Sequence, residues 1–287
     1  MVYMEKIHAD HQLVFSVLKK REKDTHKGTY GRALNIAGSR SYYGAAILST
    51  SAAIRSGCGY IYCASSKEIN QLVVSHVPEA VFIHLGEDPR MDIAQVYPQM
   101  NAISYGCGVG NEEDTQVLEY LLQGEKPLVI DADGLNRLSR QMDLLKEKKC
   151  EVILTPHLGE FKRLSNIDLT GCSLYEKAEV AQRFAQTYQS VLLLKGSTTL
   201  VAGYLSDEIY VIDSGSPGMA KAGSGDALTG ILVSLMAQGV DPLKAAVCGA
   251  WLHAEAGSTA AKKYSETAMT ASDLIECLKD VFQKYDR

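Results

Sequence analysis

Short apolar segments alternate with helical patterns along most of this 287-residue chain. Apolar runs bounded by glycine and polar residues are typical of buried strands, and periodic apolar residues between them are typical of helices. Strands are expected at 33–37, 58–64, 80–85, 102–105, 127–131, 152–155 and 191–194, and helices at 45–56, 67–75, 113–122, 159–164 and 173–188. Because parallel neighbours need a helical crossover, this order predicts an α/β fold with a largely parallel central sheet.

The two ends of the chain carry further elements. We expect a helix at 7–20 and a polar linker at the N-terminus, a β-hairpin made by 200–202 and 209–211, and helices at about 226–238, 242–262 and 271–284. No linker rich in Pro, Gly and Ser interrupts the alternation, and no internal repeat is visible. The sequence therefore predicts a single domain over residues 1–287.

A glycine-rich loop runs directly into the helix expected near 226. The loop contains Gly223, Ser224 and Gly225, and the helix follows with apolar residues at a helical spacing. Backbone N–H groups in the first turn of a helix have no intrahelical partner and carry partial positive charge, so anions bind there. Glycines allow close approach of the backbone. We expect an anion hole, suited to a phosphate, at 223–225.

Asp226 occupies the start of the same helix. An isolated Asp in this place is most often an N-cap. Beside a bound phosphate it could instead act as the base for a transferred phosphoryl group, and positioned bases contribute roughly 10²–10⁴-fold to a rate. The loop lacks the Gly-Lys-Ser/Thr of a P-loop and the surroundings of a dinucleotide fingerprint.

Polar or glycine-rich clusters follow five of the expected strands. Ligands bind beyond the carboxyl ends of parallel strands, so these clusters predict a cleft, although such loops also collect Gly and polar residues in any α/β protein. The clusters are Gly38–Ser39, Gly106–Gly110, Asp131–Asp133, Pro156–Glu160 and Lys195–Gly196.

Lys195 follows four apolar residues and is a cation at the mouth of a buried strand, where it suits a phosphate or nucleotide or serves as a structural cation on the sheet rim. Thr198 and Thr199 could donate to phosphate oxygens or begin the hairpin. His157 and Glu160 share one face of a helix start. Glu160 could hold Mg²⁺ through water and His157 could contact a substrate, or the pair could cap the helix.

Two further candidates remain open at this stage. Asp131 and Asp133 could form an acidic metal or water site, or simply end a strand. His253 lies in an Ala-rich helix beside Trp251, and we interpret it as a core or interface residue.

Composition limits the function classes. The formal net charge of −5 and the absence of a long Lys/Arg run argue against nucleic-acid binding. The longest apolar run, 227–237, is shorter than the roughly 20 residues that span a bilayer. The N-terminus has no apolar core of a signal peptide, and the seven cysteines form no zinc spacing. We expect a cytoplasmic protein with reduced thiols.

Six segments of the chain form a recognisable set. They are His26-Lys-Gly-Thr-Tyr-Gly31, Ala37-Gly-Ser39 with Gly44-Ala-Ala46, Val129-Ile-Asp-Ala-Asp133 with Leu135-Asn136, Leu154-Thr-Pro-His-Leu-Gly-Glu-Phe161, Leu194-Lys-Gly-Ser-Thr-Thr199 and Gly218-Met-Ala-Lys-Ala-Gly-Ser-Gly-Asp226. Together they resemble the ADP/ATP-dependent NAD(P)H-hydrate dehydratase family, a branch of the ribokinase-like fold, and the similarity extends over nearly the whole chain from about residue 26. Cys107 stands where the family's glycine loop often has Pro, and Gly134 where Ala is common.

This resemblance implies a three-layer α/β/α sandwich and a carbon–oxygen lyase that repairs nicotinamide cofactors. Hydrated NADH or NADPH would be dehydrated with ADP or ATP as co-substrate and Mg²⁺ as cofactor. Asp226 would deprotonate the hydroxyl, Gly223, Ser224 and Gly225 would hold the phosphoryl group, and Glu160 would help to place Mg²⁺. The nucleotide would contact Lys195, Gly196, Ser197, Thr198, Thr199 and Gly225, and the hydrated cofactor would contact Ala45, Gly108, His157 and Asp226.

The family's companion epimerase is expected as a separate protein, because only about 25 residues precede the first motif. The family further suggests a homotetramer and a preference for ADP. Two other functions stay open from the residues alone. One is a kinase for a vitamin-precursor alcohol, which would keep its phosphorylated product, and the other is a nucleotide-binding sensor without turnover.

Overall fold

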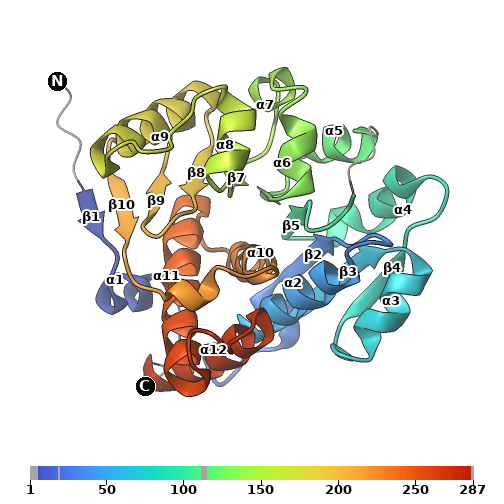
Figure 1. Ribbon diagram of the computed structural model, residues 1–287. Helices are drawn as coiled ribbons and strands as arrows, with labels where there is room; N and C mark the ends of the chain where they lie inside the picture. The colour runs from blue at the N-terminus through green and yellow to red at the C-terminus, as the bar shows by residue number, and fades with distance from the viewer. Residues whose placement is uncertain (1–5, 19, 111–114, 286–287) are drawn as a thin grey trace.

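The computed structural model describes residues 6–18, 20–110 and 115–285, and its centre is one ten-stranded sheet (Figure 1). The order of strands across the sheet is β1-β10-β9-β8-β7-β6-β5-β2-β3-β4. Their bounds are β1 Lys6–His8, β2 Arg32–Ile36, β3 Tyr60–Ser65, β4 Val81–His84, β5 Ala102–Tyr105, β6 Leu128–Ile130, β7 Val152–Leu154, β8 Val191–Leu194, β9 Thr199–Ala202 and β10 Ile209–Ile212.

All neighbouring strands run parallel except β9, which is antiparallel to both β8 and β10. The expected hairpin is therefore confirmed as β9 and β10. The carboxyl ends of β2, β5, β6, β7 and β8 lie next to one another because these five strands are parallel neighbours. This edge brings together the loops that the sequence predicts as a cleft.

Two layers of helices cover the sheet, which confirms the α/β sandwich (Figure 1). One hydrophobic core lies under the first layer and a second core under the other. The first layer contains α1 His11–Val17, α2 Tyr43–Arg55, α3 Lys67–Val74, α10 Ser224–Ala237, α11 Pro242–Tyr264 and α12 Ala271–Tyr285. The second contains α4 Pro89–Val96, α5 Gln116–Leu122, α6 Asp133–Leu138, α7 Asp143–Lys146, α8 Leu158–Ser165 and α9 Leu174–Tyr188. Short 3₁₀ helices occur at Lys27–Tyr30, Pro217–Met219 and Tyr97–Gln99.

Helix α10 is buried on all sides from Ala227 to Ala237. Gly230 of α10 allows close packing against α2, since a Cβ at Gly230 would lie 2.1 Å from the carbonyl oxygen of Ser49. A helix that is apolar all round belongs in the interior. The first turn of α10 is thus held rigidly at the carboxyl edge of the sheet.

The predicted N-terminal helix at 7–20 is wrong at its start. Lys6–His8 form β1, which pairs in parallel with β10, and the helix begins only at His11 after Asp10, whose side chain accepts from the Leu13 N–H. An unpaired edge of β10 captures the extended segment, and no local pattern reveals a partner so distant in the sequence. Helices α4, α6 and α7 were also absent from the sequence prediction. The helix expected from 113 begins at Gln116, and 113–114 lie outside the described residues.

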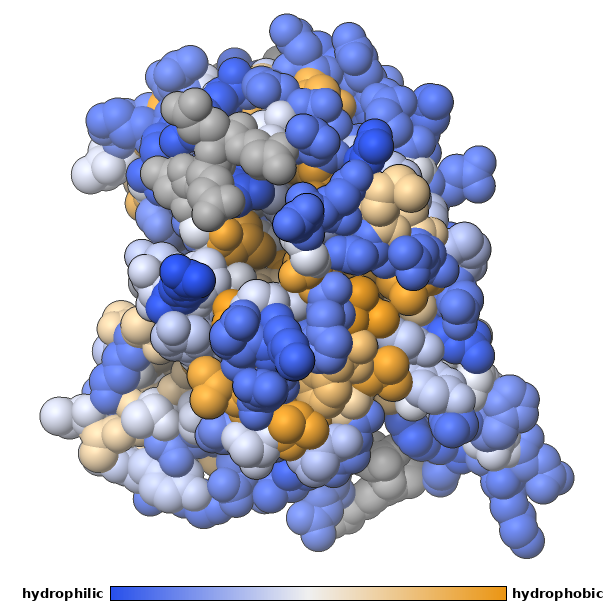
Figure 2. Space-filling view, turned by 90° about the vertical axis from the view of Figure 1, so that its right-hand side faces the viewer, coloured by the Kyte–Doolittle hydropathy of each residue, from blue (hydrophilic) through white to orange (hydrophobic). Residues whose placement is uncertain are grey.

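Figure 2 shows the face on the side of α3, α4 and β4, where apolar side chains gather among hydrophilic ones. Exposed apolar residues on these elements are Leu72, Val74, Val81 and Met91. Within the described parts of the chain, no helix is both long and apolar enough to cross a membrane.

Candidate active site

The loop before α10 leads into the helix start where the sequence predicts an anion hole. Gly223 is the N-cap of α10 and has a left-handed backbone with φ +92°, and a Cβ there would lie 2.4 Å from Leu48 Cδ1. No side chain caps this helix start. The Ser224 N–H donates to the Lys221 carbonyl at 3.4 Å. The N–H groups of Gly225 and Asp226 follow in the first turn of α10, where a helix offers no intrahelical partner and its dipole favours an anion.

Asp226 is the third residue of α10, so the N-cap interpretation is wrong. Burial, and after it the nearby charge of Asp131, raise the pKa of this carboxyl to about 6, although contact with the Cys107 thiol and the charge of Lys195 act in the opposite direction. A carboxylate with this pKa is ionised at neutral pH and binds a proton more readily than an exposed Asp. It has the properties of a general base.

Asp131, at the end of β6, is the centre of a buried ionic network. It is 1% exposed, and its two oxygens accept from Lys195 Nζ at 2.8 Å and from Thr229 Oγ1 at 2.9 Å. Burial alone would lower the pKa of Lys195, but the carboxylates of Asp131 and Glu160 outweigh it and raise that pKa. The network joins β6, β8 and the second turn of α10.

Lys195 lies beside the anion hole. A Cβ at Gly225 would be 3.3 Å from Lys195 Nζ and 3.5 Å from Asp131 Oδ2. The ammonium group therefore has both a structural partner and a position next to the expected phosphate, so the two interpretations of this residue are compatible.

His157 and Glu160 form a reciprocal capping box at the start of α8. His157 Nδ1 accepts from the N–H groups of Gly159 and Glu160, and Glu160 Oε2 accepts from the His157 N–H at 2.9 Å. The capping role is thus present. The His157 side chain is still 56% exposed, which leaves its outer surface open to a ligand.

Asp133 has a backbone partner that differs from the partners of Asp131. Its Oδ2 accepts from the Gly110 N–H at 3.0 Å, and it therefore braces the glycine loop after β5. The Arg137 guanidinium, which is buried, also donates to the carbonyl of Gly110. In the described ranges, no group of three or more His, Cys, Asp and Glu residues could hold a metal ion.

Ala45, in the first turn of α2, and Gly108, in the loop after β5, lie together. Gly108 has φ +64°, and a Cβ there would be 2.8 Å from Ala45 Cβ and 2.6 Å from Tyr42 Cβ. The Gly38 N–H donates to the Cys107 carbonyl at 2.8 Å, which ties the two loops. Only a glycine at 108 lets them approach this closely.

The segment Gly196–Thr198 is the turn between β8 and β9, and Thr199 begins β9. Gly196 and Ser197 are exposed, and both threonines are half-buried. The segment follows Lys195, whose N–H donates to the Pro156 carbonyl at 2.8 Å. It is therefore at the carboxyl edge, on the side of the anion hole.

His253 is a residue of this site that the sequence did not assign to it. Its Nε2 lies 2.9 Å from the Ser224 carbonyl oxygen and 3.2 Å from Ser224 Oγ. The sequence carried one signal, a single histidine on an Ala-rich helix, and no pattern could reveal that α11 packs beside the start of α10.

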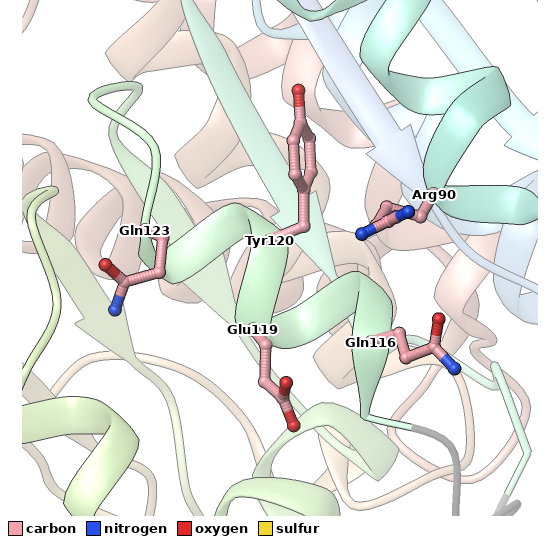
Figure 3. Close-up of a pocket in the computed structure, with 5 residues that line it drawn as sticks. All are labelled: Arg90, Gln116, Glu119, Tyr120 and Gln123. Carbon is pink, nitrogen blue, oxygen red and sulfur yellow. The ribbon is translucent and has the colours of Figure 1, made fainter.

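A separate surface pocket lies between α4 and α5. It has a volume of about 190 Å³ and is lined by Arg90, Gln116, Glu119, Tyr120 and Gln123. Figure 3 shows that these side chains point in different directions rather than toward one centre. The pocket shares no residue with the predicted site.

Comparisons with known proteins identify the family to which this fold and this arrangement of residues belong. Residues 33–280 match the model of the NAD(P)H-hydrate dehydratase family. The chain belongs to this family. It is 31% identical to the ADP-dependent (S)-NAD(P)H-hydrate dehydratase of Bacillus subtilis, over 95% of this chain and 96% of that protein.

A crystal structure of the Bacillus subtilis ADP/ATP-dependent NAD(P)H-hydrate dehydratase, co-crystallised with ATP and Mg²⁺, matches with a TM-score of 0.87 and 29% identity, covering 99% of this chain and 100% of that one. The expected ribokinase-like dehydratase fold is thereby confirmed. The chain is also 35% identical, over 94% of its length, to a bifunctional NAD(P)H-hydrate repair enzyme of Moorella thermoacetica. It spans about half of that longer family member, 53% of its length.

Proposed function

We propose that this chain dehydrates the S form of hydrated NADH or NADPH, with ADP or ATP as the phosphoryl donor. Hydroxide is a poor leaving group, so the hydroxyl of the substrate is first phosphorylated. Its C–O bond then breaks as the ring double bond is restored, and the hydroxyl oxygen leaves within inorganic phosphate. ADP ends as AMP, or ATP as ADP. Support comes from the family membership and from the named activity of the Bacillus subtilis relative.

The observation that carries this proposal is the position of Asp226. A carboxylate with a pKa of about 6 stands three residues into a helix whose start is an uncapped anion hole. Phosphoryl transfer to a hydroxyl needs a base for the hydroxyl proton and positive groups around the phosphoryl oxygens. Asp226 is the base in this proposal, and Gly223, Ser224 and Gly225 hold the transferred group.

The remaining residues of the proposed site divide between a nucleotide side and a substrate side of the carboxyl edge. On one side, Lys195 and the turn Gly196–Thr199 bind the nucleotide, because they adjoin Gly225. On the other side, Ala45 and Gly108 contact the hydrated ring. His157 completes the substrate site with its exposed edge.

The residues present fit a Mg²⁺ ion that is bound jointly by the protein and by the nucleotide phosphates. Mg²⁺ is usually held by one or two carboxylates plus substrate phosphates, not by an all-protein cage. Asp131 and Glu160 both flank Lys195, at 2.8 and 3.9 Å from its Nζ. Both Asp131 oxygens accept hydrogen bonds from Lys195 and Thr229, so Glu160 is the carboxylate that would hold the ion, through water. The charge of the ion would neutralise the phosphoryl oxygens.

The kinase alternative is weaker, since the named relatives are dehydratases. Product analysis separates the two functions. Chemically hydrated NADH, incubated with ADP or ATP and Mg²⁺, should yield one inorganic phosphate for each reduced nicotinamide recovered. Turnover that leaves phosphate on an organic alcohol, with no recovery of NADH, would favour the kinase.

The oligomeric state, the location and the domain count remain predictions. We propose a cytoplasmic homotetramer of single-domain chains that works with an NAD(P)H-hydrate epimerase. Family resemblance supports the tetramer. Light scattering coupled to size exclusion would test it, because a monomeric mass would contradict this expectation.

A further inference from the structure

Helix α11 supports the loop that leads into α10. Three residues of α11 lie against it: Ser258 Oγ accepts from the Gly215 N–H at 3.2 Å, Gly257 leaves room for the Met219 side chain, and His253 reaches Ser224. A Cβ at Gly257 would lie 2.2 Å from Met219 Sδ. His253 is therefore one of a set of contacts, and the only one of the three to reach the anion hole itself.

The direction of the His253 hydrogen bonds can be assigned. Burial lowers the pKa of His253 to about 4, so the ring is neutral at pH 7 and carries one N–H. The Ser224 carbonyl, 2.9 Å from Nε2, can only accept, so Nε2 carries the hydrogen. Ser224 Oγ, 3.2 Å from the same nitrogen, then accepts as well. The hydroxyl hydrogen of Ser224 is left for another acceptor.

The same contact acts on the peptide between Ser224 and Gly225. Its oxygen is bound by His253, and its N–H belongs to the first turn of α10, where no intrahelical partner exists. A hydrogen bond to the carbonyl polarises the amide and strengthens its N–H as a donor. It also fixes the orientation of the peptide plane.

We propose that His253 is a positioning residue of the anion hole, which directs the Ser224 hydroxyl and the Gly225 N–H toward the phosphoryl group in transfer. This inference rests on the proposed function. Loss of one donor to a developing charge costs roughly 10²–10³-fold in kcat in other enzymes. An indirect loss through His253 should be smaller, about tenfold to a hundredfold.

Three variants test the proposal. His253→Leu fills the space without a donor, and His253→Gln keeps a side-chain N–H donor. Thr259→Val is a control on the same helix, because the Thr259 hydroxyl donates within α11 itself, to the Glu255 carbonyl. We expect His253→Leu to lower kcat about tenfold to a hundredfold, with KM for the hydrated cofactor within about twofold. His253→Gln should recover most of that loss, and Thr259→Val should match wild type. Equal losses in His253→Leu and His253→Gln, or none in either, would overturn the proposal.

A second readout separates this proposal from the proposed function. Aluminium fluoride with AMP mimics a phosphoryl group in transfer and needs no hydrated cofactor. His253→Leu should weaken binding of AMP with aluminium fluoride about tenfold or more and leave binding of AMP alone unchanged, both measured by calorimetry. If wild type does not dehydrate the hydrate, this difference still tests His253. Equal effects on both ligands, or no effect on either, would overturn its role.

Discussion

The surroundings of Asp226 determine its pKa and therefore its capacity to act as a base. Its pKa is raised to about 6 by burial first and by the charge of Asp131 second. Both causes disfavour the ionised form, and proximity to Lys195 offsets them only in part. The residue is therefore a base whose protonation changes just below neutral pH.

The pH dependence of turnover should follow this pKa. Below about pH 6 Asp226 is protonated, so kcat/KM should fall roughly tenfold per pH unit and reach a plateau above pH 7. The measurement is the initial rate of NADH recovery from pH 5 to 8 with saturating nucleotide. A profile that is flat from pH 5 to 7 would contradict the assignment of Asp226 as the base.

The same shift predicts an effect on stability. A carboxyl whose pKa is higher in the folded state stabilises the fold at low pH, and this contribution is lost as the pH rises through about 6. Asp226→Asn should therefore be more stable than wild type at pH 8, by up to about 3 kcal/mol. The difference should disappear near pH 4. Urea unfolding at both pH values checks this, and a variant less stable than wild type at pH 8 would be inconsistent with a destabilising charge.

Asp131 should matter more for the fold than Asp133. Asp131→Asn removes the nearest carboxylate from the Lys195 ammonium and leaves it the more distant Glu160 at 3.9 Å, and breaking a buried pair costs roughly 3–5 kcal/mol in comparable cases. Asp133→Asn is the matched control, because Asp133 accepts one backbone N–H and should lose about 1 kcal/mol. Equal losses of unfolding free energy in the two variants would argue against the ionic network.

The sequence revealed the types of residue at the site but not their partners. Asp131, Lys195 and Thr229 come from three elements far apart in the chain, and their contact depends on β6, β7 and β8 being neighbours and on α10 crossing above them. The capping box of His157 and Glu160 was within reach of the sequence, since both bonds are local. His253 was not, because its partner lies on another helix.

At the scale of the elements, the start of α10 depends on two glycines with different requirements. Gly223 has φ +92°, and a Cβ there would lie 2.4 Å from Leu48 Cδ1, whereas Gly225 is helical and a Cβ there would lie 3.3 Å from Lys195 Nζ and 3.5 Å from Asp131 Oδ2. Gly223→Ala should destabilise the fold by roughly 1–3 kcal/mol. Gly225→Ala should keep its stability within about 1 kcal/mol of wild type yet lose most turnover, because its methyl group occupies the anion hole. Thermal unfolding and the rate of NADH recovery distinguish them, and a fully active Gly225→Ala would contradict the placement of the phosphoryl group.

Local patterns predicted most strands and helices to within a few residues, because buried strands and amphipathic helices each leave a period in the sequence. These patterns failed where contacts between residues far apart in the sequence determine the local structure. Lys6–His8 are extended because β10 offers an open edge, and α6 begins directly after Ala132, which has an unusual φ of +49° beside Asp131. Neither the open edge of β10 nor the backbone angle of Ala132 can be predicted from the residues of the segment concerned.

At the scale of the whole molecule, the candidate site and the edge strand β1 lie at different places on the sheet. The site is at the ends of β2, β5, β6, β7 and β8, while β1 covers β10 at one edge. Deleting residues 1–9 should expose the β10 edge, lower the unfolding free energy by about 1–2 kcal/mol and favour aggregation. Deletion of 1–5 is the control that keeps β1. Turnover per folded molecule should not change, and a loss of kcat would mean that the edge and the site are coupled.

The central claim is that Asp226 accepts the hydroxyl proton in a phosphorylation that leads to loss of water. The most direct measurement compares wild type and Asp226→Asn for recovery of reduced-nicotinamide absorbance from chemically hydrated NADH with ADP or ATP and Mg²⁺, after nucleotide binding has shown that both are folded. We expect recovery with phosphate release in wild type and a loss of at least about 10²-fold in the variant. Equal rates in the two proteins, or no recovery by wild type with either nucleotide, would contradict the account.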